Sequence, residues 1–148
     1  MSHEENTTEM ILKAKKEKEA SYEDLAEVVG RHKVWVAAAI QGQATMDEKE
    51  AKSLVNYLDL DEQVMNFLTA YPMKGSLAEA VPSDPLVYRF HEITQVYGTT
   101  LKEIIQEEFG DGIMSAIDFT MDVEKKEDPS GDRVIVTLDG KFLPYKKW

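Results

Sequence analysis

Three polar side chains in the second half of the chain have the types and spacing that could carry chemistry. Arg89 and Glu92 stand three residues apart, which brings both side chains to one face of a helix. Ser115 shares one face of a predicted strand with Ile113 and Ile117, where a buried hydroxyl needs a hydrogen-bond partner. Spacing alone favours the simpler interpretations, a surface ion pair and a serine bonded to a nearby carbonyl. The functional alternative is a hydroxyl that donates to a ligand.

Two helices are predicted to carry the arginine and the glutamate and to lead into the strand. Asp84 and Pro85 are typical of a helix start. The apolar spacing that follows predicts a helix that ends at Gly98. A second helix is predicted over residues 100–109, with its end at Gly110.

The periodicity then changes from helical to that of strands. The pattern predicts a strand over 113–123, a polar loop over 127–132, a strand over 133–138, a hairpin turn at Asp139-Gly140 and a return over 141–143. Two or three strands make a small sheet with exposed edges. We therefore expect a second copy of the chain to complete this half.

Helix signals dominate residues 1–80, which we expect to form a helical bundle. Capping boxes are predicted at residues 21–24 and 45–48. Short helices are predicted around residues 10–19, 22–29, 34–40, 51–58 and 64–68. Residues 72–82, with a glycine and two prolines, are interpreted as the linker to a second domain, residues 81–148. The predicted fold class is α+β.

The composition of the chain excludes several classes of function. Its 148 residues carry a net charge of -11, which repels nucleic acid and anionic membranes. The absence of cysteine excludes disulfide scaffolds, thiolate zinc sites and cysteine nucleophiles, and three histidines are few for a metal site. No apolar run approaches the roughly 20 residues of a membrane span, and no signal or transit peptide is visible, so we expect a cytoplasmic protein with no membrane partner.

Residues 21–42 have the pattern of a helix-turn-helix, which raises DNA binding as the alternative function. The candidate recognition helix carries alanines at 37–39, where polar side chains that read bases are expected. The basic side chains near this helix that could contact phosphate are few for binding DNA: Arg31, His32 and Lys33. A helical bundle that shares this packing without binding DNA is the simpler interpretation.

Four strings in residues 82–148 resemble the cyanases, the bicarbonate-dependent cyanate lyases. They are YRFHE at 88–92, QVYGTTLK at 95–102, FGDGIMSAI at 109–117 and LDGKFLP at 138–144. The first half matches that family more loosely. The resemblance implies an N-terminal bundle similar to a λ-repressor-like helix-turn-helix domain without its DNA-binding role. It also implies a small C-terminal α+β domain whose intertwined antiparallel strands form a dimer.

The resemblance also implies the site and the reaction. Arg89, Glu92 and Ser115 match the catalytic residues of that family, and Ala116 and Leu143 match positions that line its anion site. The implied reaction converts cyanate and bicarbonate to carbamate and carbon dioxide, and the carbamate then yields ammonia. Bicarbonate is the co-substrate, and no metal or other cofactor is implied. The implied assembly is a homodecamer built from dimers.

Electrostatics agrees with a site that is shared between copies. Two anions held about 4 Å apart repel by roughly 4 kcal/mol at an effective dielectric constant of about 20. Arg89 is one of two arginines in residues 81–148, and one guanidinium per chain is little for two anions. Two other classes stay open from the residues alone: an oligomeric helix-turn-helix regulator, and a protein that binds small anions without turnover.

Overall fold

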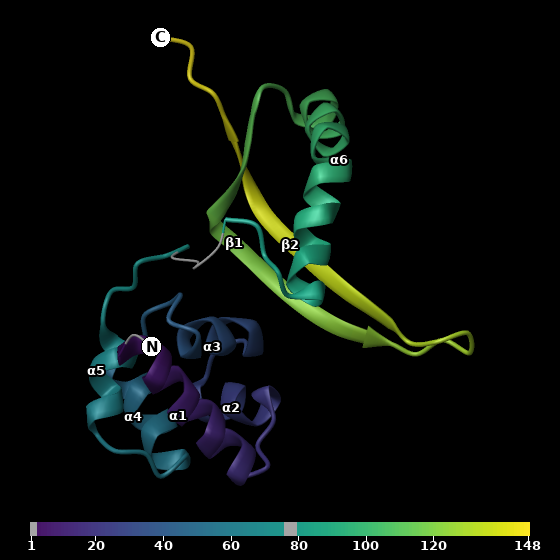
Figure 1. The fold of residues 1–148 in the computed structure, drawn as a ribbon. Coiled ribbons are helices and arrows are strands. Elements are labelled where there is room, and N and C mark those ends of the chain that lie inside the picture. Colours follow the sequence, from purple (N-terminus) through teal and green to yellow (C-terminus); the bar gives the residue numbers. More distant parts are fainter. Residues whose placement is uncertain (1–2, 76–79) are drawn as a thin grey trace. The chain divides into compact units, whose positions relative to one another are not determined.

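The computed structural model describes residues 3–75 and 80–148, and it divides the chain into two compact units at residues 76 and 77. The described residues form six helices and one antiparallel pair of strands (Figure 1), which confirms the predicted α+β class. Part of the predicted linker, residues 76–79, lies outside the described residues. No helix in the described part combines the length and the apolar composition needed to cross a membrane.

The N-terminal unit is built from five short helices. They are α1 (His3–Glu17), α2 (Tyr22–Val29), α3 (Lys33–Ile40), α4 (Glu48–Tyr57) and α5 (Gln63–Thr69). Helices of this length are marginal alone, so their stability comes from the apolar faces that they bury together. The largest fully buried side chains come from all five helices and the segment before α4: Ile11, Leu25, Val36, Ile40, Met46, Leu54 and Leu68.

Side-chain caps set where two of these helices begin. The capping box that was predicted at the start of α2 is present, because Ser21 Oγ accepts from the N–H of Asp24 and the carboxylate accepts in return. The box predicted at residues 45–48 is wrong by two positions, since Asp47 and Glu50 form the one that starts α4. Thr45 is engaged elsewhere, donating its hydroxyl to the carbonyl of Ala70 at 2.9 Å.

The C-terminal unit begins with one long helix, α6 (Pro85–Phe109), where two were predicted. Asp84 caps it as predicted, accepting from the N–H groups of Leu86 and Val87 at 2.9 Å each. The predicted break at Gly98 is wrong. This glycine lacks the positive φ of a helix end, and the cost of glycine in a helix interior, about 1 kcal/mol, is too small to interrupt the helix. The helix ends at Gly110, whose φ of +96° suits glycine.

The two strands form a long hairpin, β1 (Gly112–Lys126) paired with β2 (Arg133–Pro144). The polar loop predicted over 127–132 connects them. The hairpin turn predicted at Asp139-Gly140 is wrong, because both residues lie within β2, opposite Thr120 and Phe119. No separate return strand exists in the described residues, since β2 continues straight to Pro144.

A wide bulge interrupts β1 near its start. Met114 pairs with Phe142 and Phe119 pairs with Gly140, so five steps along β1 match two steps along β2. Three extra residues therefore lie in β1 between these pairs. The bulge ends the predicted alternation of faces: Ser115 is 5% exposed, whereas Ile117 is 97% exposed.

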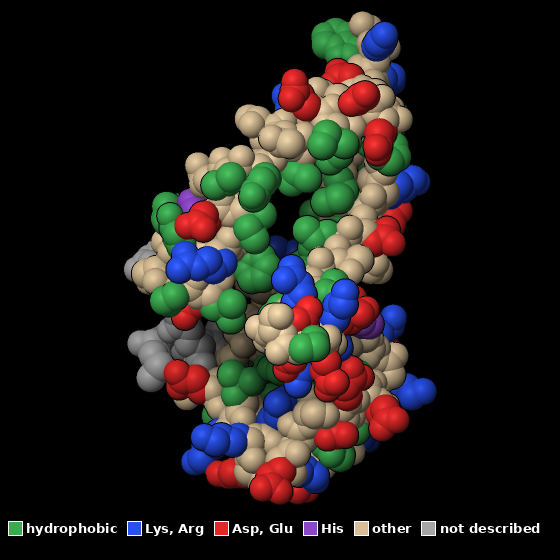
Figure 2. Space-filling model, turned by 90° about the vertical axis from the view of Figure 1, so that its right-hand side faces the viewer, with side chains coloured by type: hydrophobic (Ala, Val, Ile, Leu, Met, Phe, Trp, Pro, Cys, Tyr) green, Lys and Arg blue, Asp and Glu red, His purple; other side chains and the backbone are tan. Residues whose placement is uncertain are grey.

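The C-terminal unit leaves most of its apolar surface uncovered. Among residues 80–148, Ser115 is the one buried residue, and α6 buries none. The apolar stripe of α6 is between 48% and 71% exposed at Leu86, Phe90, Ile93, Tyr97, Leu101 and Ile104. Hydrophobic side chains accordingly show over the surface of this unit (Figure 2). Such a surface is typical of one that another protein chain covers.

Candidate active site

Arg89 and Glu92 lie side by side on the first part of α6, as their spacing predicts. Nη1 of the arginine lies 3.6 Å from Oε2 of the glutamate, and the two side chains are 60% and 50% exposed. An exposed pair of this kind contributes less than about 1 kcal/mol to stability. The ring of Tyr88 lies 5.9 Å from the guanidinium carbon and 5.7 Å from the ring of His91. The guanidinium is therefore held next to a carboxylate and an aromatic ring while it stays open to an anion.

Ser115 occupies the start of the β1 bulge, and its hydroxyl is placed by the backbone of the bulge. The N–H groups of Ile117 and Asp118 both donate to Ser115 Oγ at 3.0 Å. These two bonds use the acceptor capacity of the hydroxyl oxygen and leave its hydrogen available to donate. The simpler interpretation from the sequence, a serine that donates to a neighbouring carbonyl, is not what the structure has: in the described residues this hydroxyl makes no donated hydrogen bond.

The remaining predicted residues lie on the same part of the hairpin. Ala116 follows Ser115 in the bulge and is exposed. Leu143 pairs with Ile113 across the hairpin and is 39% exposed. The structure thus brings the serine, the alanine and the leucine to one end of the hairpin.

The helix pair and the hairpin residues are not joined within one chain. In the described residues, no hydrogen bond or ion pair links Arg89 or Glu92 to Ser115. A ring stack of α6 on the hairpin lies at the opposite end of the helix, where Phe109 and Phe142 have centroids 5.2 Å apart. One chain therefore presents a cationic group and a hydrogen-bond donor as two separate surfaces.

The donor set of these surfaces is a guanidinium, a carboxylate and a hydroxyl, which suits small anions. Across the described ranges, no group of three or more histidine, aspartate or glutamate side chains is arranged to hold a metal ion. Residues 81–148 carry 8 basic and 13 acidic side chains, a net of -5. Attraction for an anion must therefore be local, at the guanidinium and at oriented donors.

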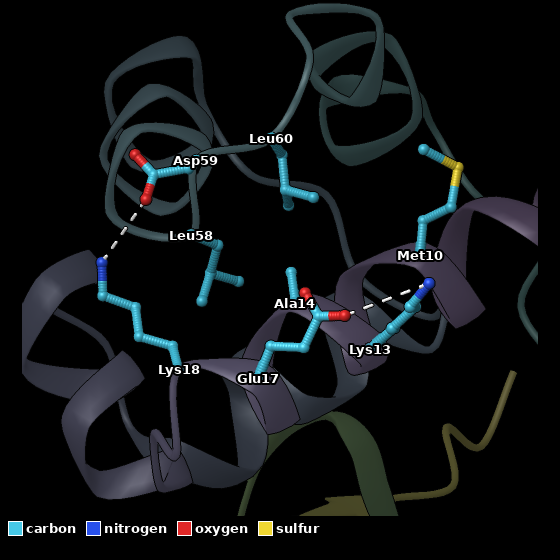
Figure 3. Close-up of a pocket in the computed structure, with 8 residues that line it drawn as sticks. All are labelled: Met10, Lys13, Ala14, Glu17, Lys18, Leu58, Asp59 and Leu60. Carbon is cyan, nitrogen blue, oxygen red and sulfur yellow. Dashed lines mark ion pairs between the residues drawn. The ribbon is translucent and has the colours of Figure 1, made fainter.

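A cavity in the N-terminal unit holds none of the predicted site residues. It has a volume of about 520 Å³ and lies between α1 and the segment that follows α4 (Figure 3). Apolar side chains of both segments face it, and two ion pairs lie along it. These pairs join Lys13 to Glu17 at 4.0 Å and Lys18 to Asp59 at 3.9 Å. Each charge there already has a partner of opposite sign, so the cavity offers no net charge to an anion.

The helix-turn-helix of α2 and α3 is poorly equipped to bind DNA. Nε of Arg31 lies 2.6 Å from Oε2 of Glu50, and this hydrogen bond raises the pKa of the arginine. Lys33 Nζ lies 3.1 Å from a carboxylate oxygen of Glu23. Two of the three bases that could contact phosphate are thus paired with carboxylates of the same chain, which weakens the DNA-binding alternative.

Comparison with known families gives matches to both halves of the chain. Residues 79–147 match the family described as "Cyanate lyase C-terminal domain", and residues 4–72 match the one described as "Cyanate hydratase, N-terminal". The chain is 57% identical over 141 residues to the cyanate hydratase of Prochlorococcus marinus subsp. pastoris, with 95% of this chain and 96% of that protein covered. It is 58% identical to the cyanate hydratase of Trichormus variabilis over the same length, with the same coverage.

Comparison with solved structures points to the same family as the sequence relatives. The crystal structure of cyanase from T. urticae matches with a TM-score of 0.83 and 42% sequence identity, covering 94% of this chain and 97% of that one. The agreement thus includes the fold as well as the sequence.

Proposed function

The chain belongs to the cyanate lyase family, and from that premise we propose that it decomposes cyanate with bicarbonate as co-substrate, using Arg89, Glu92 and Ser115. It is an enzyme, a lyase that acts on cyanate. The DNA-binding regulator is not favoured. The proposed reaction joins cyanate, bicarbonate and a proton to give carbamate and carbon dioxide. The carbamate then takes up a second proton and breaks down to ammonia and carbon dioxide.

The chemical difficulty of this reaction is that both reactants are anions. A planar guanidinium that is always charged lowers their repulsion and can hold one of them with two parallel hydrogen bonds. We assign this role to Arg89, which is 60% exposed and has one carboxylate beside it. Glu92 orients the guanidinium and transfers the proton that the reaction consumes. Holding two reactants in contact is itself a large source of rate enhancement.

Ser115 supplies the complementary group, a hydroxyl that donates. The observation that carries the proposal is the geometry of this serine: it is 5% exposed and has its acceptor capacity filled by two backbone N–H groups. Its free hydrogen can donate to a bound anion and to charge that develops on it during the reaction. Ala116 and Leu143 line the anion site beside it. No metal or organic cofactor is needed for any of these roles.

The working enzyme is proposed to be a homo-oligomer, a decamer built from dimers, in the cytoplasm. The apolar stripe of α6 supports assembly, because none of its residues is buried within the chain. Separation of the guanidinium from the serine in one chain supports a site that takes Arg89 and Ser115 from different copies.

The experiment that tests this function is ammonia release from cyanate and bicarbonate by matched arginine variants. Arg89→Leu should abolish ammonia release, because it removes the charge that holds the anion. Arg133→Leu is the control, since it removes the other arginine of residues 81–148, at the start of β2. Arg133→Leu should keep the wild-type rate. Full activity in Arg89→Leu would reject the proposed site, and no ammonia from the wild type above a boiled sample would reject the reaction.

A further inference from the structure

Gly140 lies opposite the β1 bulge, where the two strands of the hairpin approach each other closely. A β-carbon at this position would lie 2.5 Å from the carbonyl oxygen of Ser115 and 2.6 Å from Cγ of Met114. Ordinary contacts of carbon atoms are about 3.5–4.0 Å. Because the first of these neighbours is backbone, it cannot move aside as a flexible side chain could. Any residue other than glycine at 140 must therefore displace the peptide that carries Ser115.

The two peptides that follow this one in the bulge set the direction of the serine hydroxyl. Ser115 Oγ is held by the N–H groups of Ile117 and Asp118, both at 3.0 Å, and both belong to the bulge. A shift of the Ser115 carbonyl changes the path of the bulge and with it these two bonds. The loss of either bond would return a lone pair to the hydroxyl, which could then accept a hydrogen bond instead of only donating one.

We infer that Gly140 is a positioning residue for the reaction, because its missing side chain allows the bulge that holds Ser115 as a dedicated hydrogen-bond donor to an anion. This inference rests on the proposed role of Ser115 in binding the substrate. The glycine touches no substrate and acts only through the serine. The ligand class that this arrangement selects is a small anion with an acceptor atom toward the hydroxyl.

The first test is Gly140→Ala with Gly98→Ala as its matched control. Both variants add one methyl group to the C-terminal unit, but a β-carbon at 98 meets only Cγ2 of Thr94, at an ordinary 3.8 Å. Gly140→Ala should keep the wild-type oligomer and circular dichroism while kcat falls by about 100-fold, the cost of misplacing a catalytic group by about 1 Å. Gly98→Ala should keep the wild-type kcat. Wild-type kcat in Gly140→Ala would overturn the inference.

The second test is a double-mutant cycle of Gly140→Ala and Ser115→Ala, which separates a glycine that acts through the serine from one with only a structural role. Its readout is the calorimetric dissociation constant for azide, a linear triatomic anion like cyanate that needs no turnover. If Gly140 acts only through Ser115, the double variant should bind azide as weakly as Ser115→Ala alone. A further loss in the double variant would overturn the inference. Wild-type azide affinity in Ser115→Ala would instead reject the role of the serine, and the inference with it.

A third variant pair keeps the inference testable if Gly140→Ala does not assemble. Ile117→Pro removes one N–H that donates to Ser115 Oγ and adds no atom opposite the bulge, whereas Ile117→Ala keeps that N–H. The proline variant should bind azide at least about tenfold more weakly than the alanine variant, which corresponds to the loss of one oriented hydrogen bond. Equal azide affinity in the two variants would show that the bulge does not position the serine and would overturn the inference.

Discussion

Leu101 tests whether the exposed stripe of α6 is an interface between copies. Its side chain is 52% exposed within the chain, so about half of its apolar surface can still be buried by another copy. Full burial of a leucine contributes about 1.5–3 kcal/mol, and covering the remaining half contributes about 1 kcal/mol. In a two-fold dimer both copies lose the same side chain, so Leu101→Ala should cost about 2 kcal/mol, or about 30-fold in the dissociation constant.

The assay for Leu101→Ala is sedimentation velocity over a dilution series, with ammonia release measured on the same samples. Glu103→Ala is the control, because its side chain lies on the opposite side of α6 and is polar and exposed. The variant should dissociate at a concentration about 30-fold higher than the wild type. If the site is shared, its specific activity should fall over the same range. Dissociation and activity identical to those of the Glu103→Ala control would refute the assignment of this face to the interface.

Two further predictions concern the N-terminal unit. The hydrogen bond from the Glu50 N–H is the chief reason that the pKa of Asp47 lies below its ordinary value of 3.8. The ionised carboxylate therefore stabilises the fold fully when the pH is above 3.8, and this stabilisation is lost as the pH falls from 3.8 through the lowered pKa. Asp47→Asn keeps a capping oxygen but cannot titrate, so its melting temperature by calorimetry should fall less than that of the wild type below pH 3.8; parallel decreases would contradict this. Leu54→Ala should lower the free energy of unfolding by about 2–5 kcal/mol in a denaturant titration, because Leu54 is fully buried; an unchanged midpoint would contradict the assigned core.

Most signals that act within a few residues were predicted well from the sequence, although the second capping box begins at Asp47 and not at Thr45. The caps at Ser21 and Asp84 and the helix end at Gly110 are present where their residue types indicate. Each depends on a hydrogen bond or a backbone angle that nearby residues determine alone. The contact between Arg89 and Glu92 was predicted correctly for the same reason, because side chains three residues apart in a helix lie next to each other.

Two errors, at Gly140 and at Gly98, occurred where a local signal has two physical causes. Glycine after an aspartate is typical of a hairpin turn, but it is also required where two backbones approach closely. At Gly140 the close approach of two backbones applies, because the Ser115 carbonyl lies next to this glycine although the two residues are far apart in sequence. Gly98 likewise carries a signal for a helix end that the continuing helix overrides. Pairing between distant strands was needed to tell these cases apart.

For the candidate site, the sequence and the family resemblance name residues whose roles stay a proposal, and they do not give the geometry of the site. Residue types and the family resemblance named Ser115, whereas the bulge that turns it into a donor depends on the register of β1 against β2. The positioning role inferred for Gly140 was missed for that reason. Its sequence signal is a glycine inside a β-branched strand segment, but glycine after aspartate is also typical of a turn.

The central claim is that the chain degrades cyanate at sites that combine Arg89 of one copy with Ser115 of another. Its most direct test is to dissociate Arg89→Leu and Ser115→Ala proteins, mix them in equal amounts, reassemble them and measure ammonia release from cyanate and bicarbonate. Each variant alone should be inactive. In the mixture, half of the randomly paired dimers join one copy of each variant, and one of their two sites is intact, so about a quarter of the wild-type activity should return. A mixture as inactive as its components would contradict a shared site.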